Sequence, residues 1–429
     1  MCYNTRGSTL NSGTMTQKIY SWLKWVEPWY LAYALLGATS AGLIPILLPV
    51  VVSRAGNASD IGLVMAAISL GGVTAPLWGS LADRYRLHRV LLAGGLLVAT
   101  CGLAAFSFTS TPAAWQGLAL LTSIGVAASA TVANLFVVEV HPQAEWDERI
   151  GWLQTFYGGG QVAGLVLAGV LTQLDLHIGL LAAAALTGLA ILPGWLTTRT
   201  PPVPLSPRPA LLYPARHGEW ATGSPQRLFH HMNLSAWRQL RSALRSPFGI
   251  FLAVWSLAFA GVAAFFALYP VLMQQVYGVA PGVSSVAFAI AAGLGLALYS
   301  PAGHWSDRFG GARVLQAALS VRLLAFLSLL GLRVVHVSNP GWFALLAFAF
   351  TVLAWSLLSV GGTALTARLA PVGEGEGMGI FNAATALAGV IGAASGGWVA
   401  GHWGYGAVSG LAAAGVALGL LLALTTHPA

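Results

Sequence analysis

Twelve long apolar stretches, separated by polar segments, make up most of this chain of 429 residues. A helix needs about 20 predominantly apolar residues to cross the hydrocarbon core of a bilayer, and each stretch is near or above that length. None alternates apolar and polar residues with a period of two, which excludes a membrane β-barrel. Because lipid offers the backbone no hydrogen-bond partners, the sequence predicts an all-α integral membrane protein with twelve transmembrane helices. We expect them at residues 28–52, 60–82, 90–109, 113–139, 150–173, 177–197, 247–273, 282–305, 313–335, 340–367, 377–399 and 403–425.

The composition argues against a soluble domain and against an enzyme. Hydrophobic residues make up 57% of the chain and charged residues 7%, whereas a soluble domain is about a quarter charged. Cys2 and Cys101 form neither a disulfide framework nor a zinc-site spacing, and the histidines are scattered. The sequence contains no recognisable nucleophile–base arrangement and no phosphate-binding loop. We therefore expect no enzyme activity, no cofactor and no metal site.

A proline-rich, polar and basic segment divides the twelve stretches into two groups of six. Such a composition is typical of a linker between two units. The predicted organisation is an N-terminal segment at residues 1–27, a first six-helix bundle at 28–197, a linker at 198–246, a second six-helix bundle at 247–425 and a tail at 426–429.

Lysine and arginine are distributed unevenly over the predicted loops. Of the 20 lysines and arginines, only Arg54 and Arg333 fall in loops on one side, and Arg322 lies inside the ninth stretch. All others fall on the side of the termini and the linker. Because cytoplasmic loops carry an excess of these residues, we expect an inner-membrane protein with both termini and the linker in the cytoplasm. The net charge of +8 is then an orientation signal, since no basic soluble domain suited to nucleic acid is expected.

One charged motif occurs twice, after the second stretch and again after the eighth. The copies are GSLADRYRLHRVLL at residues 79–92 and GHWSDRFGGARVLQ at residues 303–316. The matching residues, at one constant offset, include Gly79 and Gly303, Asp83 and Asp307, Arg84 and Arg308, and Arg89 and Arg313. A second match pairs Gln154 with Asn382, near the starts of the fifth and eleventh stretches. Because six helices are an even number, the halves are predicted to be parallel repeats about an axis along the membrane normal.

The span count, the central linker and the motif pair together resemble the major facilitator superfamily, from about residue 28 to 425. The resemblance implies a transporter with alternating access, whose substrate site lies at the midplane between the halves. It also implies that Asp83 contacts the start of the eleventh helix at residues 377–379 and that Asp307 contacts the start of the fifth at 150–151. The amino-terminal end of a helix attracts a carboxylate, so these contacts would close the cytoplasmic side.

The motif charges leave two interpretations open. In the first, Arg84, Arg89 and Glu139 add an ion network to the gate formed by the two aspartates. In the second, all these charges only flank helices and fix the orientation of the chain. The first is favoured, because orientation requires arginines but does not require a repeated aspartate.

The candidate substrate site combines uncharged polar side chains with aromatic rings, on helices that the resemblance places around the central cavity. Amide side chains are costly in lipid, so a cavity or an interhelical hydrogen bond is favoured for them. A serine or threonine is more often bonded to the backbone of its own helix. The candidate substrate-binding residues are Thr39, Asn134, Gln154, Tyr157, Gln161, Trp255, Tyr269, Trp355 and Asn382.

No aspartate or glutamate is expected at mid-depth in any stretch, although intramembrane acids mark proton relays. We therefore expect a small, neutral or weakly charged, partly apolar solute, with export as one direction of transport. Protons stay open as a coupling ion, through weak coupling or an acid at a helix end such as Asp60. Arg322 either reaches inward to meet an anion or has a structural role.

Two alternatives are kept. The first is a proton-coupled drug exporter with atypical coupling residues, because the Gly-Pro pair and the arginine usual in that class, in the fifth and fourth helices, are absent. The second is a receptor or scaffold with a transporter fold and no flux. In each case we expect a monomer in the lipid bilayer.

Overall fold

The computed structural model describes residues 25–85, 87–142, 145–198, 246–335, 339–371 and 374–425. Within these ranges the chain is helical except for short turns and caps, and it contains no β-strand. The all-α architecture expected from the sequence is confirmed. The predicted linker and the two terminal segments lie almost entirely outside the described residues, so their boundaries stay predictions.

The first half forms six membrane-spanning segments, of which the first, second and sixth are each built from consecutive shorter helices. Its helices are α2 (Tyr30–Gly37), the π-helical turn η1 (Ala38–Leu43), α3 (Ile44–Ala55), α4 (Ala58–Gly71), the 3-10 turn η2 (Gly72–Thr74), α5 (Ala75–Tyr85), α6 (His88–Phe106), α7 (Pro112–Val140), α8 (Trp146–Leu171), α9 (Leu176–Leu189) and α10 (Ile191–Thr197).

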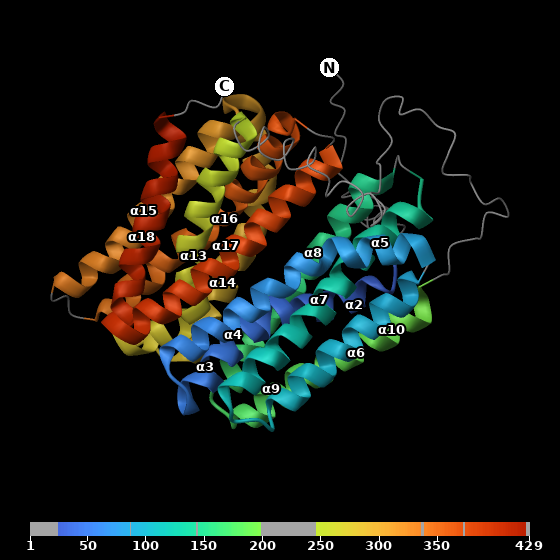
Figure 1. Cartoon of the computed structure of the whole chain (residues 1–429), viewed down its shortest axis with the longest axis horizontal. Helices are drawn as coiled ribbons and strands as arrows, with labels where there is room; N and C mark the ends of the chain where they lie inside the picture. The colour runs from blue at the N-terminus through green and yellow to red at the C-terminus, as the bar shows by residue number, and fades with distance from the viewer. Residues whose placement is uncertain are drawn as a thin grey trace, which may run out of the picture.

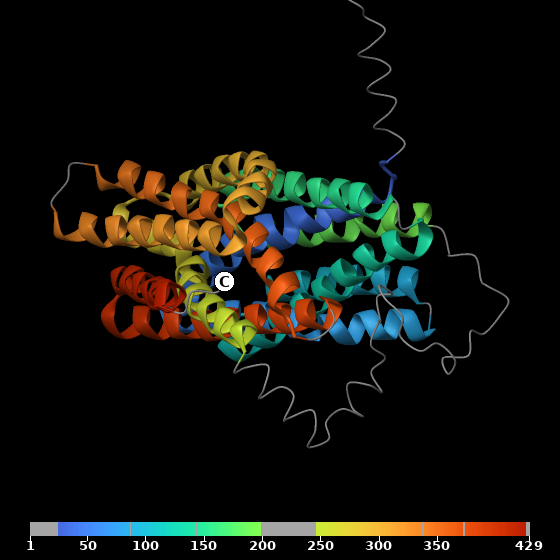
Figure 2. The ribbon, with the colours of Figure 1, turned by 90° about the horizontal axis from the view of Figure 1, so that it is seen from above.

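The second half forms six further spans, each a single long helix. They are α13 (Pro247–Tyr277), α14 (Pro281–Phe309), α15 (Gly311–Val334), α16 (Pro340–Leu369), α17 (Glu374–Trp403) and α18 (Tyr405–Thr425). Figure 1 shows the two halves as neighbouring bundles, and Figure 2 shows the same division after a quarter turn.

Proline and glycine account for many of the helix boundaries. Proline is favoured in the first helical turn, where its missing N–H is not needed, and glycine is favoured where a helix ends with a positive φ. Helices α7, α13, α14 and α16 each begin at a proline. The glycines with positive φ, each directly after a helix or before the next one, are Gly278, Gly310 and Gly404.

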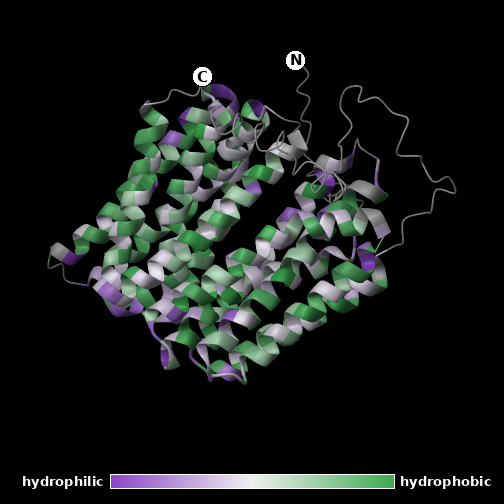
Figure 3. Cartoon of the chain, viewed as in Figure 1, coloured by the Kyte–Doolittle hydropathy of each residue, from purple (hydrophilic) through white to green (hydrophobic). Residues whose placement is uncertain are grey.

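Every apolar stretch expected from the sequence overlaps one of the twelve spans. Eleven of these are long and apolar enough to cross a membrane by length and composition. The remaining span, α8, has a similar length but carries Gln154, Gln161 and several glycines. Figure 3 shows apolar residues along the helices of both halves, with many of the polar residues near the helix ends.

The spans run alternately in opposite directions, so their connections lie on two sides of the molecule. We call the side with the α5–α6, α7–α8, α14–α15 and α16–α17 connections the linker side, since α10 ends there and α13 begins there. We call the opposite side, with the α3–α4, α6–α7, α8–α9, α13–α14, α15–α16 and α17–α18 connections, the far side.

The halves meet along two seams, one between α4 and α17 and the other between α8 and α14. In the first seam, a Cβ on Gly397 would lie 2.6 Å from the Gly62 Cα and 2.8 Å from the Ala58 carbonyl oxygen. In the second, a Cβ on Gly282 would lie 2.7 Å from the Gly169 carbonyl oxygen. In the sequence repeat, Asp83 and Asp307 are 224 residues apart and Gln154 and Asn382 are 228 residues apart. The first offset relates Ala58 to Gly282 and the second relates Gly169 to Gly397. The two seams are therefore pseudo-symmetric, as parallel repeats require.

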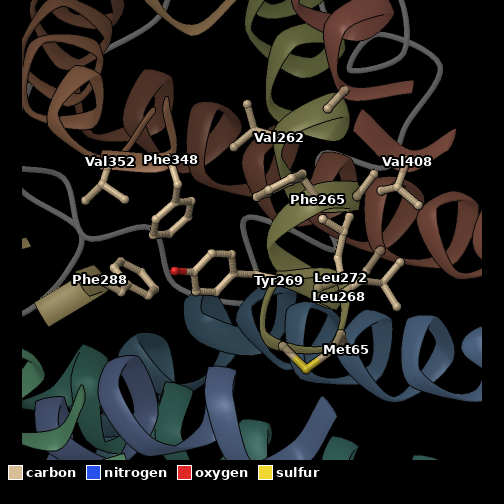
Figure 4. Packing of buried hydrophobic residues seen from close by; sticks show 14 of the residues in the cluster. Met65, Val262, Phe265, Leu268, Tyr269, Leu272, Phe288, Phe348, Val352 and Val408 are labelled. Carbon is tan, nitrogen blue, oxygen red and sulfur yellow. The ribbon is translucent and has the colours of Figure 1, made fainter. Parts of the chain in front are cut away.

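The second half has a dense aromatic core between α13, α14 and α16. The rings of Tyr269 and Phe348 stack with their centroids 3.8 Å apart, and Phe288 contacts both rings edge-on. Figure 4 shows these rings beside Phe265, with Met65 of α4 approaching α13 from the first half. The core of the second half thus continues into its contact with the first.

Candidate functional site

The two seams end at equivalent depths, partway toward the linker side. A Cβ on Gly158 would lie 2.7 Å from a methyl carbon of Leu296, and a Cβ on Gly72 would lie 3.7 Å from the Ala386 Cβ. The repeat offsets relate Gly158 to Ala386 and Leu296 to Gly72. Closer to the linker side, α8, α14 and α17 have positions with open space, namely Gly151, Gly303 and Gly379. The halves pack closely along α4 and α8, whereas α5, the linker-side part of the second span, packs only against helices of its own half. The contact between the halves is therefore concentrated toward the far side.

Gln154 and Asn382 lie one helical turn beyond the last seam contacts, and both side chains are exposed. They come from different halves, on α8 and α17, and the repeat places them at equivalent positions. Both lie more than two turns inside their helices, and exposed amides at such positions of membrane helices are expected where the helices face a polar space. The two residues therefore mark the entrance to the space between the halves.

A chain of polar side chains crosses the first half beside this entrance. The Gln154 Nε2 donates to the Asn134 Oδ1 at 3.2 Å, and the Asn134 Nδ2 donates to the Tyr33 hydroxyl at 3.2 Å. The Tyr33 and Tyr157 rings lie 5.0 Å apart, and the Tyr157 hydroxyl is 3.0 Å from the Ser40 Oγ. We call these five residues the polar network. It brings together three predicted residues, Asn134, Gln154 and Tyr157.

The second half contributes aromatic rings instead, of which Phe259 and Trp355 are half-buried and Trp255 and Phe381 are buried. Trp255 lies at the centre of the group, with ring centroids 4.7 Å from Phe381, 6.2 Å from Phe259 and 6.2 Å from Trp355. The Trp255 Nε1 donates to the Thr385 Oγ1 at 2.9 Å, which fixes the indole between α13 and α17. We call Trp255, Phe259, Trp355 and Phe381 the aromatic cluster; it contains both predicted tryptophans, and Asn382 adjoins it in sequence.

Two predicted substrate-binding residues lie in tightly packed surroundings. Thr39 is fully buried, where its hydroxyl donates to the Leu35 carbonyl oxygen and accepts from Thr187. Tyr269 is buried in the aromatic core, and its hydroxyl donates to the Ser284 carbonyl oxygen at 2.8 Å (Figure 4). Hydrogen bonds within the packed helices satisfy both hydroxyl groups, so neither residue is part of the proposed site.

Another predicted residue, Gln161, is half-buried on α8, two turns from Gln154.

Arg322 lies directly behind the aromatic cluster, near the middle of α15. Its side chain is 3% exposed, and its Nε donates to the Thr351 carbonyl oxygen at 3.2 Å. The guanidinium carbon lies 5.7 Å from the centroid of the Trp355 ring. Within the described ranges, no ion pair joins Arg322 to a carboxylate.

A family model described as Major Facilitator Superfamily matches residues 29–374 and 296–429. The chain belongs to the Major Facilitator Superfamily. It is therefore a multi-pass membrane protein, in agreement with its apolar helices.

Curated superfamily relatives match part of the chain. It is similar to a "Tetracycline resistance protein, class C" of Escherichia coli, with 34% identity over 165 residues, covering 37% of this chain and 41% of that protein. A class E protein of the same name and organism is 32% identical over 167 residues, covering 38% and 41%. The match thus spans about two-fifths of the length of these relatives.

Solved structures extend the likeness to nearly the whole chain. The crystal structure of the nucleoside transporter NupG superposes with a TM-score of 0.69 and 14% identity, covering 93% of this chain and 96% of that one. A D-xylose-proton symporter superposes with a TM-score of 0.67 and 16% identity, covering 92% and 95%. At such identities the likeness concerns the superfamily fold alone.

The superfamily motif loops lie on the linker side. In the second copy, Asp307, Arg308 and Arg313 are exposed, and the Arg308 guanidinium lies over the Phe309 ring. In the first copy, Gly79 packs near Thr131 and Leu135 of its own half. The side chains of Asp83, Arg84 and Glu139 lie outside what the structure describes, so the predicted gate and its ion network stay predictions.

Arg89 of the first motif copy has a partner that the sequence did not suggest. It donates to the Trp195 carbonyl oxygen, and its guanidinium lies 4.2 Å from the Trp195 ring centroid. This contact joins the start of α6 to α10 within one half. In this conformation Arg89 therefore stabilises the first bundle.

Sequence reasoning also missed a charged cluster on the linker side of the first half. Glu27 accepts from Arg149 at 3.0 Å, from the Trp29 indole at 2.9 Å, and lies 2.7 Å from the His141 Nε2. Arg149 in turn pairs with Glu145 at 2.9 Å. The four-residue spacing of Glu145 and Arg149 was a detectable signal, since such pairs meet on one helix face. Glu27 lies too far away in sequence to be assigned to them.

Proposed function

We propose that this superfamily member is a secondary transporter that exports a small, partly apolar, neutral or weakly charged solute by alternating access. The observation that carries the proposal is the pair of unlike surfaces near the ends of the seams, the polar network on one half and the aromatic cluster on the other. A solute held between them would find hydrogen-bond partners on one side and ring faces on the other. Binding pockets for small molecules combine apolar walls with a few placed polar groups in this way.

In the proposed cycle, the described conformation takes up solute from the linker side. The seams exclude passage on the far side, because backbone of one half lies against backbone of the other at Gly62 and Gly397. Rocking of the halves would open these seams and bring the motif loops toward the opposite half. The uneven distribution of arginine supports a linker side that faces the cytoplasm, with the far side outside the inner membrane.

Export is favoured by the relatives named for tetracycline resistance, since removal of a drug from the cytoplasm is one way in which a membrane transporter confers resistance. Tetracycline is therefore the first solute to test. We propose that the chain acts as a monomer in the bilayer, with a small-molecule solute as its partner and protons as the coupling ion to be examined. Enzyme activity and nucleic-acid binding are not part of the proposal.

Flux into everted membrane vesicles tests the proposal. Vesicles that contain the protein should accumulate tetracycline when a pH gradient is imposed, and control vesicles should not. Trp355→Ala should weaken apparent affinity about 2- to 10-fold, the effect expected from losing aromatic contacts. Trp342→Ala is the matched control, because Trp342 lies on the same helix but is 74% exposed at its far-side end.

The outcomes also separate the alternatives. Specific binding of tetracycline without any flux, in vesicles where the protein is folded, would favour a receptor or scaffold. An equal loss of affinity in both tryptophan variants would argue against a solute site at the aromatic cluster. A panel of other aromatic drugs extends the assay, and absence of flux for every member would reject the proposed function.

Coupling through Asp60 is a separate part of the proposal. The Asp60 carboxylate accepts from the Asn57 backbone N–H at 2.9 Å, and the Asn57 side chain accepts from the Asp60 N–H at 3.0 Å. This capping box starts α4 at the closed far side. Asparagine at position 60 retains an oxygen that can accept the same hydrogen bond but removes the titratable acid, so Asp60→Asn separates coupling from capping.

A further inference from the structure

Arg322 is a buried charge, and among the residues that the structure describes no carboxylate pairs with it. The described structure records one hydrogen bond for its guanidinium, to the Thr351 carbonyl oxygen, and a ring contact with Trp355. In the sequence, no aspartate or glutamate falls in the middle of a helix; all lie between the helices or near helix ends. A charged residue at mid-membrane is costly, and arginines in such places usually serve a ligand or an ion.

A simple structural role explains this arginine poorly. The hydrogen bond to a backbone carbonyl can be made by an uncharged side chain such as glutamine, and a single cation–π contact with Trp355 does not replace a counter-charge. A buried ion without its partner is strongly destabilising, whereas apolar or neutral replacements of similar size are often tolerated. The retained charge is best explained by a negative group that is present only during part of the cycle.

The guanidinium borders a small cavity shared with the proposed solute site. The cavity lies between α13, α15 and α16, and its walls include Trp255, Phe259, Trp355 and Leu319 in addition to Arg322. It has room for about one water molecule. Three of its wall residues belong to the aromatic cluster, and the rings of Phe259 and Trp355 are only half-buried. These two rings are thus the partly exposed walls of the cavity that Arg322 borders.

We propose that Arg322 binds the single anionic group of the transported solute, which is a flat, partly apolar weak acid. The body of the solute would lie against the half-buried rings of Phe259 and Trp355, and its carboxylate, enolate or phenolate oxygen would reach the guanidinium when the Trp355 ring swings aside. One arginine balances one negative charge, and aromatic walls exclude water from the pair, which strengthens it. This inference rests on the proposed function and narrows its solute to a monoanion.

The experiment compares probes that differ only in charge. Purified protein is titrated with 2-naphthoate, 2-naphthamide and 2-naphthylmethylammonium, together with a panel of aromatic carboxylates and their amides, while thermal stability and binding heat are recorded. The wild type should bind anionic members more tightly than their neutral amides. Arg322→Gln should weaken binding of the anions about 10- to 100-fold and leave the amides within about twofold, the effect of losing a charge-assisted hydrogen bond.

Two further variants separate recognition from folding. Arg322→Lys should restore part of the anion preference, because it keeps the charge but loses the planar guanidinium. Arg333→Gln is the matched control, since Arg333 lies on the same helix, close to the same face, but is exposed at the far side. It should bind all probes like the wild type. If Arg322→Gln fails to fold, the lysine variant and the charge preference of the wild type still decide the question.

Three results would overturn the inference. They are a panel in which no anion binds the wild type, a preference for amides or cations, and anion binding that survives Arg322→Gln. Failure of the proposed function is seen elsewhere, as absence of flux for every solute in vesicles. Flux of neutral solutes without any anion preference would therefore reject the role of Arg322 and leave the transporter proposal standing.

Discussion

A single methyl group added at Gly397 should bias the conformational equilibrium of the whole protein. Gly397 lies in the seam between α17 and α4, where a Cβ would be 2.6 Å from the Gly62 Cα and 2.8 Å from the Ala58 carbonyl oxygen. Both neighbours are backbone atoms, which cannot rotate out of the way as a side chain can. Gly397→Ala therefore requires the two helices to separate on the far side.

The size of the effect follows from the overlap. Side chains that overfill a packed interface cost about 1–3 kcal/mol. The cost arises only while the far side is closed, so it changes the ratio of the two states by about 5- to 150-fold in favour of the state open on the far side. The equivalent change in the other seam, Gly169→Ala, should have a smaller effect, because its Cβ would lie 3.0 Å from the Gly282 carbonyl oxygen.

Spin-label distances on both sides of the molecule measure this shift. One pair, at Leu174 and Val335, reports on the far side, and a second pair, at Leu196 and Leu424, reports on the linker side; all four residues are exposed. In Gly397→Ala the far-side distance should increase while the linker-side distance decreases.

The control for Gly397→Ala is Gly94→Ala, because a Cβ at Gly94 meets open space. It should leave both distances unchanged. Distances in Gly397→Ala that match the wild type, in protein that is folded and stable, would show that the seam does not govern the exchange between states.

Three further predictions concern orientation, gating and coupling. In a cysteine-free background, a cysteine at Asn57 should react with an impermeant thiol reagent applied to intact cells, and one at Gly223 should not; labelling at Gly223 would reverse the topology. Asp83→Asn and Asp307→Asn should each reduce flux and favour the state open on the linker side. If the linker-side spin-label distances are unchanged in both variants, these acids only fix the orientation of the chain. Asp60→Asn should abolish accumulation driven by a pH gradient while the helix cap persists, and strong accumulation in this variant would place coupling elsewhere.

The sequence was sufficient for the helices and for the repeat, and it was less informative about side-chain partners. Span positions follow from apolar length, because the bilayer imposes the same requirement on every helix. The match between Gln154 and Asn382 pointed to two exposed side chains, each one turn beyond a seam contact, and their role at a solute site stays a prediction. By contrast, Thr39 and Tyr269 resembled site residues because polar groups in apolar helices can either face a cavity or bond to backbone, and only the packing distinguishes these cases.

Some partners depend on contacts that no local pattern encodes. Tyr33 joins the polar network through Asn134, which is distant in the chain and lies on a different helix. Phe259 and Phe381 were indistinguishable from core residues until their rings were found against Trp255. The spacing of Tyr33 and Ser40, seven residues apart on one helix face, was the only signal for the network in the first span.

The seams and the site differ in symmetry, and this difference has a functional consequence. The seams are nearly equivalent, because rocking of two repeats about one axis requires matching contacts on both sides, and these are made largely by backbone at small residues. The site is unlike on its two faces, polar in the first half and aromatic with a buried arginine in the second. The solute contacts side chains, whereas the seams are formed largely by backbone. A substitution in the site can therefore change which solute is preferred without changing how the two halves separate. Substitutions at Gly397 should therefore change the flux of every solute by a similar factor, whereas those at Gln154, Trp355 or Arg322 should change the order of preference among solutes.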